Sequence, residues 1–215
     1  MTHQQNSSIK SKNKVFALVT ITAIFSLCYA ILRYNIFGSI PWKDLPFFIM
    51  NKAISLTAII LFAISNSLTF QDKNVKISQE WLDICKSIGI TSFFLIITHV
   101  LMSFLLFKPE IFPNFFEEDG MISLIGGLSM TAGIISFVLL WGINLNARAN
   151  KEINVLLNSV PTVLNVAIVF VAIHLFFMGY QGWLTPSKWQ GGLPPISLIS
   201  FVFSVTGLLF KNFIR

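Results

Sequence analysis

The stretch SIGITSFFLIITHVLMSFLLF, residues 87–107, runs for 21 residues without a charged side chain. A helix needs about 20 mostly apolar residues to cross a bilayer, so this stretch predicts a membrane-spanning helix. The whole chain has the same character: of its 215 residues, 54% are hydrophobic and 11% are charged, and the mean hydropathy is +0.75. Soluble domains carry about 25% charged residues, so the composition indicates an integral membrane protein.

Other uncharged runs along the chain predict an all-α membrane protein, a bundle of six transmembrane helices. The predicted spans cover residues 14–37, 47–68, 82–107, 121–146, 157–180 and 194–211. Residues 1–13 are polar and predict a disordered cytoplasmic tail, which leaves 14–211 as a single transmembrane domain. The first span has a longer apolar run than a signal peptide and no small-residue cleavage site, so we expect an uncleaved helix.

The net charge of +6 raises the question of a nucleic-acid partner, but the distribution of the basic residues answers it. With a cytoplasmic N-terminus, ten of them fall inside and five outside, as the positive-inside rule requires. The inner ones are Lys10, Lys12, Lys14, Lys73, Lys76, Lys86, Arg148, Lys151, Lys211 and Arg215, and the outer ones are Arg33, Lys43, Lys52, Lys108 and Lys188. We therefore predict cytoplasmic N- and C-termini, membrane lipid as a partner and no nucleic acid.

Two predicted outer loops, 108–120 and 179–195, are rich in proline and aromatic residues. The second contains Trp183 and Trp189, which fit either an aromatic belt at the membrane interface or a docking surface for an external partner. It could equally form one wall of a quinone site. The sequence contains no G-x-G-x-x-G phosphate loop and no Cys/His spacing typical of zinc or iron–sulfur sites. Soluble nucleotide or zinc enzymology is therefore not indicated.

Two histidines interrupt the apolar spans. His99 and His174 lie on spans predicted to run in the same direction, roughly 12 and 9 Å from their outer ends at about 1.5 Å per residue. Ionisable groups inside a membrane are costly and are functional candidates by default. The simplest alternative is that each ring makes one hydrogen bond to a neighbouring helix and does nothing else.

Haem suits these two rings better than other chemistry does. A proton relay normally has carboxylates along its path, and a zinc site needs more ligands. Two neutral imidazoles, by contrast, can fill both axial positions of a haem iron and favour electron transfer. Small residues on the same spans would make room for the macrocycle, although they are also common where membrane helices pack closely. They are Gly89, Ser92, Gly126, Gly127, Gly133 and Gly142.

Three stretches resemble the ferric reductase-like transmembrane domain. CKSIGITSFFLIITHV (85–100) is similar to its third helix, with a basic residue, an x-x-Gly step and a histidine. MTAGIISFVLLWGINLNAR (130–148) resembles the next helix, and VPTVLNVAIVFVAIH (160–174) resembles the fifth, which ends in a haem-ligating histidine. The resemblance covers roughly residues 47–180. Within this family it is closest to the haem-binding membrane subunits of the periplasmic methionine sulfoxide reductase system.

The resemblance implies b-type haem with His99 and His174 as the axial ligands of the iron. It also implies electron transport from a cytoplasmic flavin reductase or quinol towards a periplasmic or other extracytoplasmic redox partner. The chain departs from the family at Pro161, where a further histidine is usual, thirteen residues before His174. Proline cannot ligate iron, so we expect one haem per chain rather than two.

The expectation is thus a haem b electron-transfer protein of the bacterial inner (plasma) membrane, a redox subunit of an oxidoreductase system. Flavin or quinone is a conceivable second cofactor, although no motif indicates either. The alternative is a haem-free membrane scaffold or small transporter that retains the ferric reductase-like fold. Pro161 favours this alternative because the usual inner histidine is missing.

Overall fold

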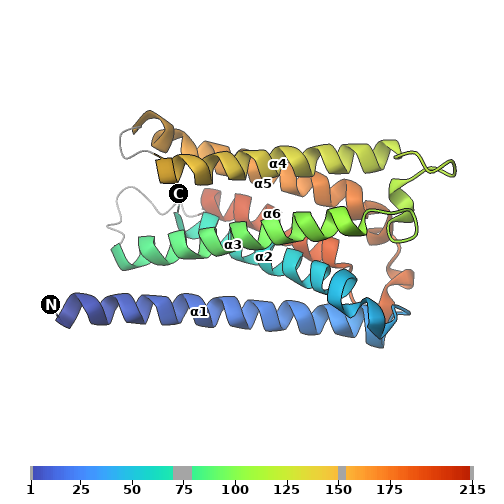
Figure 1. Ribbon diagram of the computed structural model, residues 1–215, viewed down its shortest axis with the longest axis horizontal. Coiled ribbons are helices and arrows are strands. Elements are labelled where there is room, and N and C mark those ends of the chain that lie inside the picture. Colours follow the sequence, from blue (N-terminus) through green and yellow to red (C-terminus); the bar gives the residue numbers. More distant parts are fainter. Residues whose placement is uncertain (1, 70–78, 150–153, 214–215) are drawn as a thin grey trace. The chain divides into compact units, whose positions relative to one another are not determined.

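The computed structural model describes residues 2–69, 79–149 and 154–213, with side chains for 11–67, 80–145 and 160–209. Within these residues the structure consists of long helices and short helical segments (Figure 1). The long helices are α1 (Thr2–Ile31), α2 (Met50–Thr69), α3 (Gln79–Leu106), α4 (Leu124–Ala149), α5 (Asn154–Trp183) and α6 (Ile196–Phe213). The described part of the chain contains no β-strand, so the predicted all-α class is confirmed there.

Six helical segments in the described residues are long and apolar enough to cross a membrane. They are Ser11–Ile36, Trp42–Ser67, Glu80–Leu106, Leu124–Leu145, Val160–Trp183 and Gln190–Leu209. Their number and order match the predicted spans. A helix satisfies its own backbone hydrogen bonds, which is why such segments are helical in a bilayer. By the length and composition of its helices, the chain is a multi-pass membrane protein.

The helices group into two compact units. Unit 1 comprises Met1–Val100 and Thr206–Arg215, and unit 2 comprises Leu101–Val205. The sequence predicts one transmembrane domain over 14–211, and the structure divides that segment between the two units. Helix α1 begins at Thr2, so it includes most of the polar segment for which the sequence predicts a disordered tail.

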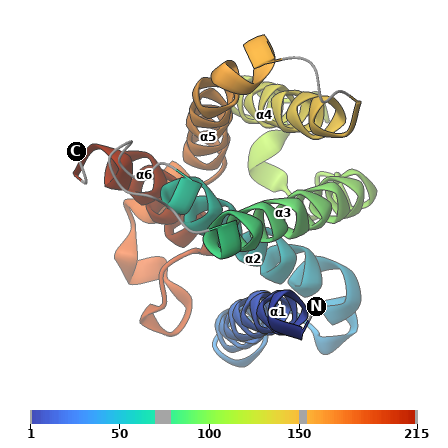
Figure 2. The ribbon, with the colours of Figure 1, turned by 90° about the vertical axis from the view of Figure 1, so that its left-hand side faces the viewer.

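Apolar side chains from three helices hold unit 1 together. Leu61 of α2 and Ile84 and Ile88 of α3 form a buried cluster, against which Val15 and Leu18 of α1 pack. Figure 2 shows these three helices from the end at which α1 begins. The packing is of the kind that non-polar faces of neighbouring helices form throughout helical membrane proteins.

The connection from α1 to α2 determines where α2 begins. It consists of short helical segments: η1 (Leu32–Ile36), η2 (Trp42–Asp44) and η3 (Leu45–Ile49). Tyr34 of η1 packs edge-on against Phe48 of η3, with 5.8 Å between ring centroids. Segment η3 leads directly into α2, so Asn51 is the second residue of α2 and lies between the buried residues Ile49 and Ala53.

Unit 2 is built on α4 and α5, which run side by side (Figures 1 and 2). The predicted loop 179–195 begins within α5, which ends at Trp183, and it contains the short helical segments η5 (Pro186–Lys188) and η6 (Gln190–Gly192). Its indole N–H groups are both used within the unit: Trp183 donates to Ser197 Oγ at 3.0 Å and Trp189 to the backbone oxygen of Gly182 at 2.9 Å. The loop is therefore tied to its own unit by both tryptophans.

Candidate functional site: two hydrogen-bonded histidines

His99 is a half-buried residue of α3 whose ring is hydrogen-bonded to α2. Its Nδ1 lies 2.7 Å from Oδ1 of Asn51, and the Asn51 side chain is 2% exposed. An amide oxygen can only accept a hydrogen bond, so Nδ1 of His99 carries the proton and donates it. In a neutral imidazole the lone pair is then on Nε2, the atom that would bind a metal.

The Asn51–His99 bond is one of three polar contacts at regular intervals between α2 and α3. Ser92 Oγ donates to the backbone oxygen of Ala58 at 2.8 Å, and Ser65 Oγ donates to that of Cys85 at 2.9 Å. The α2 members are residues 51, 58 and 65 and the α3 members are 99, 92 and 85, so both series step by seven residues in opposite directions. Seven residues are about two helical turns, which places all three contacts on one seam between antiparallel helices.

His174 is held in the same manner in unit 2, but by a different acceptor. Its Nδ1 lies 2.8 Å from the backbone oxygen of Ser129 on α4. The Ser129 hydroxyl lies 3.1 Å from the same Nδ1 and donates to the backbone oxygen of His174 at 3.0 Å. Ser129 is fully buried. Because a carbonyl oxygen accepts, Nδ1 again carries the proton and Nε2 the lone pair.

Unit 2 repeats the seven-residue spacing of unit 1. Ser136 Oγ of α4 donates to the backbone oxygen of Ala167 on α5 at 3.0 Å. Ser136 follows Ser129 by seven residues, and Ala167 precedes His174 by seven. Each histidine is therefore one member of a polar seam between two antiparallel helices, α2 with α3 or α4 with α5.

Gly133 explains how the His174 ring can come so close to the α4 backbone. A Cβ atom at Gly133 would lie 3.0 Å from His174 Nδ1 and 3.4 Å from Cε1, tighter than most real contacts. In an α-helix the carbonyl of residue 129 accepts from the N–H of residue 133, so Gly133 lies directly beside the Ser129 acceptor. The absence of a side chain at residue 133 leaves the space that the ring fills.

The other glycines for which the sequence suggests room for a macrocycle have different surroundings. A Cβ at Gly89 would meet Ser65 Oγ at 2.9 Å, and one at Gly126 would meet the backbone oxygen of Phe115, so both glycines allow close packing. A Cβ at Gly127 or Gly142 would meet nothing within 4 Å. Of these glycines, Gly133 is the one whose space is taken by a histidine ring.

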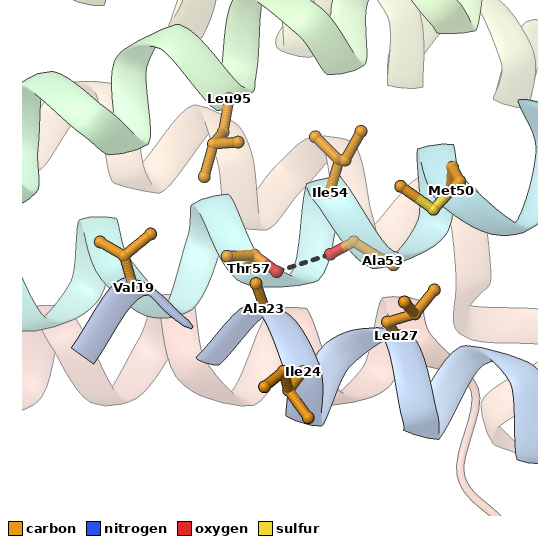
Figure 3. Close-up of a pocket in the computed structure, with 9 residues that line it drawn as sticks. All are labelled: Val19, Ala23, Ile24, Leu27, Met50, Ala53, Ile54, Thr57 and Leu95. Carbon is orange, nitrogen blue, oxygen red and sulfur yellow. Dashed lines mark hydrogen bonds between the residues drawn. The ribbon is translucent and has the colours of Figure 1, made fainter. Parts of the chain in front are cut away.

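Unit 1 also contains an apolar cavity of about 200 Å³. Val19 and Leu27 of α1, Met50 and Thr57 of α2 and Leu95 of α3 are among the residues that line it (Figure 3). Thr57, a polar residue in the lining, donates its hydroxyl to the backbone oxygen of Ala53 at 2.9 Å. The cavity therefore suits hydrocarbon rather than a polar substrate.

The sequence predicted both histidines as candidate site residues, and it missed their partners Asn51 and Ser129. The sequence did not single out Asn51, because the predicted spans also contain Asn35, Asn66, Asn144, Asn158 and Asn165. Ser129 had no signal either, because serine is common in membrane helices. Among the described side chains there is no group of three or more His, Cys, Asp or Glu residues that could hold a metal ion.

The fold and the two seams thus describe a multi-pass membrane protein in which His99 and His174 have the same tautomer. Comparison of the chain with protein-family models found no match, and comparison with curated proteins found none either.

Proposed function

We propose that this chain is a haem b-binding electron-transfer protein of the bacterial inner membrane, with His99 and His174 as the axial ligands of the iron. The observation that carries the proposal is that both rings are protonated on Nδ1. Each donates Nδ1–H to an oxygen of a neighbouring helix, at 2.7 Å for His99 and 2.8 Å for His174. Metal-ligating histidines almost always donate their other ring N–H in this way, which fixes the tautomer and raises the basicity of the ligating nitrogen.

The residues present fit the demands of such a group. Asn51 and the Ser129 carbonyl each keep a proton on Nδ1, so Nε2 of each ring carries the lone pair that iron needs. Gly133 keeps the His174 ring close to its acceptor. A haem iron whose two axial positions are filled by imidazole transfers single electrons and does not bind oxygen.

The direction of electron flow is part of the proposal and follows from the resemblance to the ferric reductase-like domain. Electrons would come from a cytoplasmic flavin reductase or from quinol and would pass to an acceptor on the outer face. Pro161 stands inside α5 where the family usually has a histidine, and this supports one haem per chain.

One structural observation favours the alternative function, a haem-free scaffold. Both histidines belong to polar seams whose other members are serine hydroxyls bonded to carbonyls. Such contacts stabilise helix pairs without any cofactor, each by about 0.5–1 kcal/mol. A direct assay for haem separates the two functions.

The test is a reduced-minus-oxidised difference spectrum of the full-length chain, purified after expression with haem supply, with haem measured per polypeptide. We expect a low-spin b-type spectrum in the wild type and its loss in His99→Ala and in His174→Ala. His3→Ala is the matched control, because His3 is the remaining histidine of the sequence and lies near the N-terminus. A wild-type protein without Soret absorbance would refute the proposal and favour the scaffold.

A further inference from the structure

The two histidines differ in what holds them. His174 donates to a main-chain carbonyl, which every residue at position 129 would provide. His99 donates to a side chain, the carboxamide of Asn51. We infer that Asn51 is the positioning residue of His99: its oxygen sets the tautomer and the orientation of that ring, and thereby makes Nε2 the ligating atom. The consequence for ligation rests on the proposed function, whereas the effect on the tautomer does not.

Asn51 is rigidly placed for this role. Its side chain is 2% exposed, and the residues around it on the same helix, Ile49, Ala53 and Leu56, are buried. Burial removes the freedom of the carboxamide to turn towards lipid or water. The oxygen is therefore presented to α3 in one position, as a preorganised acceptor must be.

The other two contacts of the seam bond α2 to α3 independently of Asn51. Ser92 and Ser65 bond α3 and α2 to each other at 2.8 and 2.9 Å. Both contacts use backbone carbonyls and lie seven and fourteen residues from Asn51 along α2. Helices α2 and α3 are thus bonded to each other without Asn51. The role that we assign to its carboxamide is to orient the His99 ring.

The chemistry of the bond predicts what Asn51 changes. An acceptor that polarises the Nδ1–H bond raises the electron density at Nε2. It therefore strengthens the bond from Nε2 to iron. An apolar residue at position 51 removes the acceptor and leaves a buried N–H of His99 to find another. A carboxylate there would accept more strongly and would favour ferric over ferrous iron.

Asn66 provides a matched control. It is on the same helix, its side chain is 1% exposed, and its Nδ2 donates to the backbone oxygen of Gly207 at 3.3 Å. Asn66→Leu therefore removes a buried carboxamide of α2 and its hydrogen bond to Gly207, but leaves the acceptor of the His99 ring in place. Any effect that both variants share belongs to helix packing.

The experiment has two readouts on the full-length chain. The first is ¹⁵N NMR of histidine-labelled protein prepared without haem, with the His99 signals assigned by their loss in His99→Ala. We expect the Nδ1–H tautomer in the wild type, in Asn66→Leu and in Asn51→Asp, and its loss in Asn51→Leu. A wild-type His99 protonated on Nε2, or a tautomer unchanged in Asn51→Leu, would overturn the inference.

The second readout is haem affinity, measured by titration of haem into the same proteins. We expect Asn51→Leu to bind haem about 10–100-fold more weakly, the usual effect of losing the partner of a ligating histidine. Asn66→Leu should stay within about twofold of the wild type, and Asn51→Asp should restore affinity with a lower reduction potential. Equal losses in both leucine variants would overturn the inference. A wild type that binds no haem but shows the Asn51-dependent tautomer would refute the proposed function and leave the positioning role intact.

Discussion

Nδ1 of His174 lies 2.8 Å from the backbone oxygen of Ser129, so a main-chain atom is the acceptor of this ring. The Ser129 hydroxyl donates in return to the backbone oxygen of His174 at 3.0 Å. The two residues therefore bond α4 to α5 in both directions. Because the acceptor is main chain, a substitution at position 129 can remove the hydroxyl without removing the bond to the ring.

Ser129→Ala should accordingly preserve haem binding. We expect the His174 ring to keep its acceptor and the difference spectrum to stay unchanged. Loss of the hydroxyl bond should lower the free energy of unfolding by about 1 kcal/mol. The measurements are haem per polypeptide and a denaturation curve in detergent. Loss of haem in Ser129→Ala would show that the hydroxyl, and not the carbonyl, holds the ring.

Gly133→Ala should displace the His174 ring. The added methyl would lie 3.0 Å from Nδ1, so either the ring or α4 has to shift. We expect haem affinity to fall by about tenfold or more, because the bond that orients the ligand is disturbed.

The control for Gly133→Ala is Gly142→Ala on the same helix, where an added methyl meets nothing within 4 Å. It should bind haem as the wild type does. If the two alanine variants bind haem equally well, the space at Gly133 has no part in holding His174.

Ser92→Ala should affect stability alone. Its hydroxyl bonds α3 to the backbone oxygen of Ala58, one seam contact away from His99. Interhelical hydrogen bonds in membranes contribute about 0.5–1 kcal/mol each, so we expect a loss of that size in the free energy of unfolding. The absorption spectrum should not change. A spectral change in this variant would indicate that the Ser92–Ala58 contact, and not Asn51, controls the orientation of His99.

Haem stoichiometry tests the meaning of Pro161. With proline at that position of α5, we expect one haem per polypeptide, measured by pyridine haemochrome against amino-acid analysis. Pro161→Ala should leave the ratio at one, because alanine cannot ligate iron either. Two haems per chain in the wild type would show that the second iron uses ligands outside the family pattern.

Cysteine labelling tests the predicted orientation. In a background of Cys28→Ala and Cys85→Ala, a membrane-impermeant maleimide should label Glu118→Cys in intact cells. Lys12→Cys should react only after permeabilisation, because the basic residues predict a cytoplasmic N-terminus. Both positions are exposed in the structure, so access is decided by the side of the membrane. The opposite labelling pattern would reverse the direction of electron transfer in the proposal.

The sequence by itself determined the membrane class, the number and order of the helices and the two histidines of interest. Hydropathy suffices for this because the cost of placing about 20 residues in a bilayer depends on their own side chains and hardly on their neighbours. The polar exceptions, His99 and His174, are visible for the same reason: they stand out against apolar sequence.

Only the tertiary structure decided what each ring contacts. Asn51 is 48 residues from His99 in sequence, and Ser129 is 45 from His174. Each pairing depends on how two antiparallel helices are rotated and offset against each other. Packing along the whole length of the helix pair sets that rotation and offset. No property of either residue alone predicts it. The tautomer of both histidines, and therefore the atom each would offer to a metal, is a result of that packing.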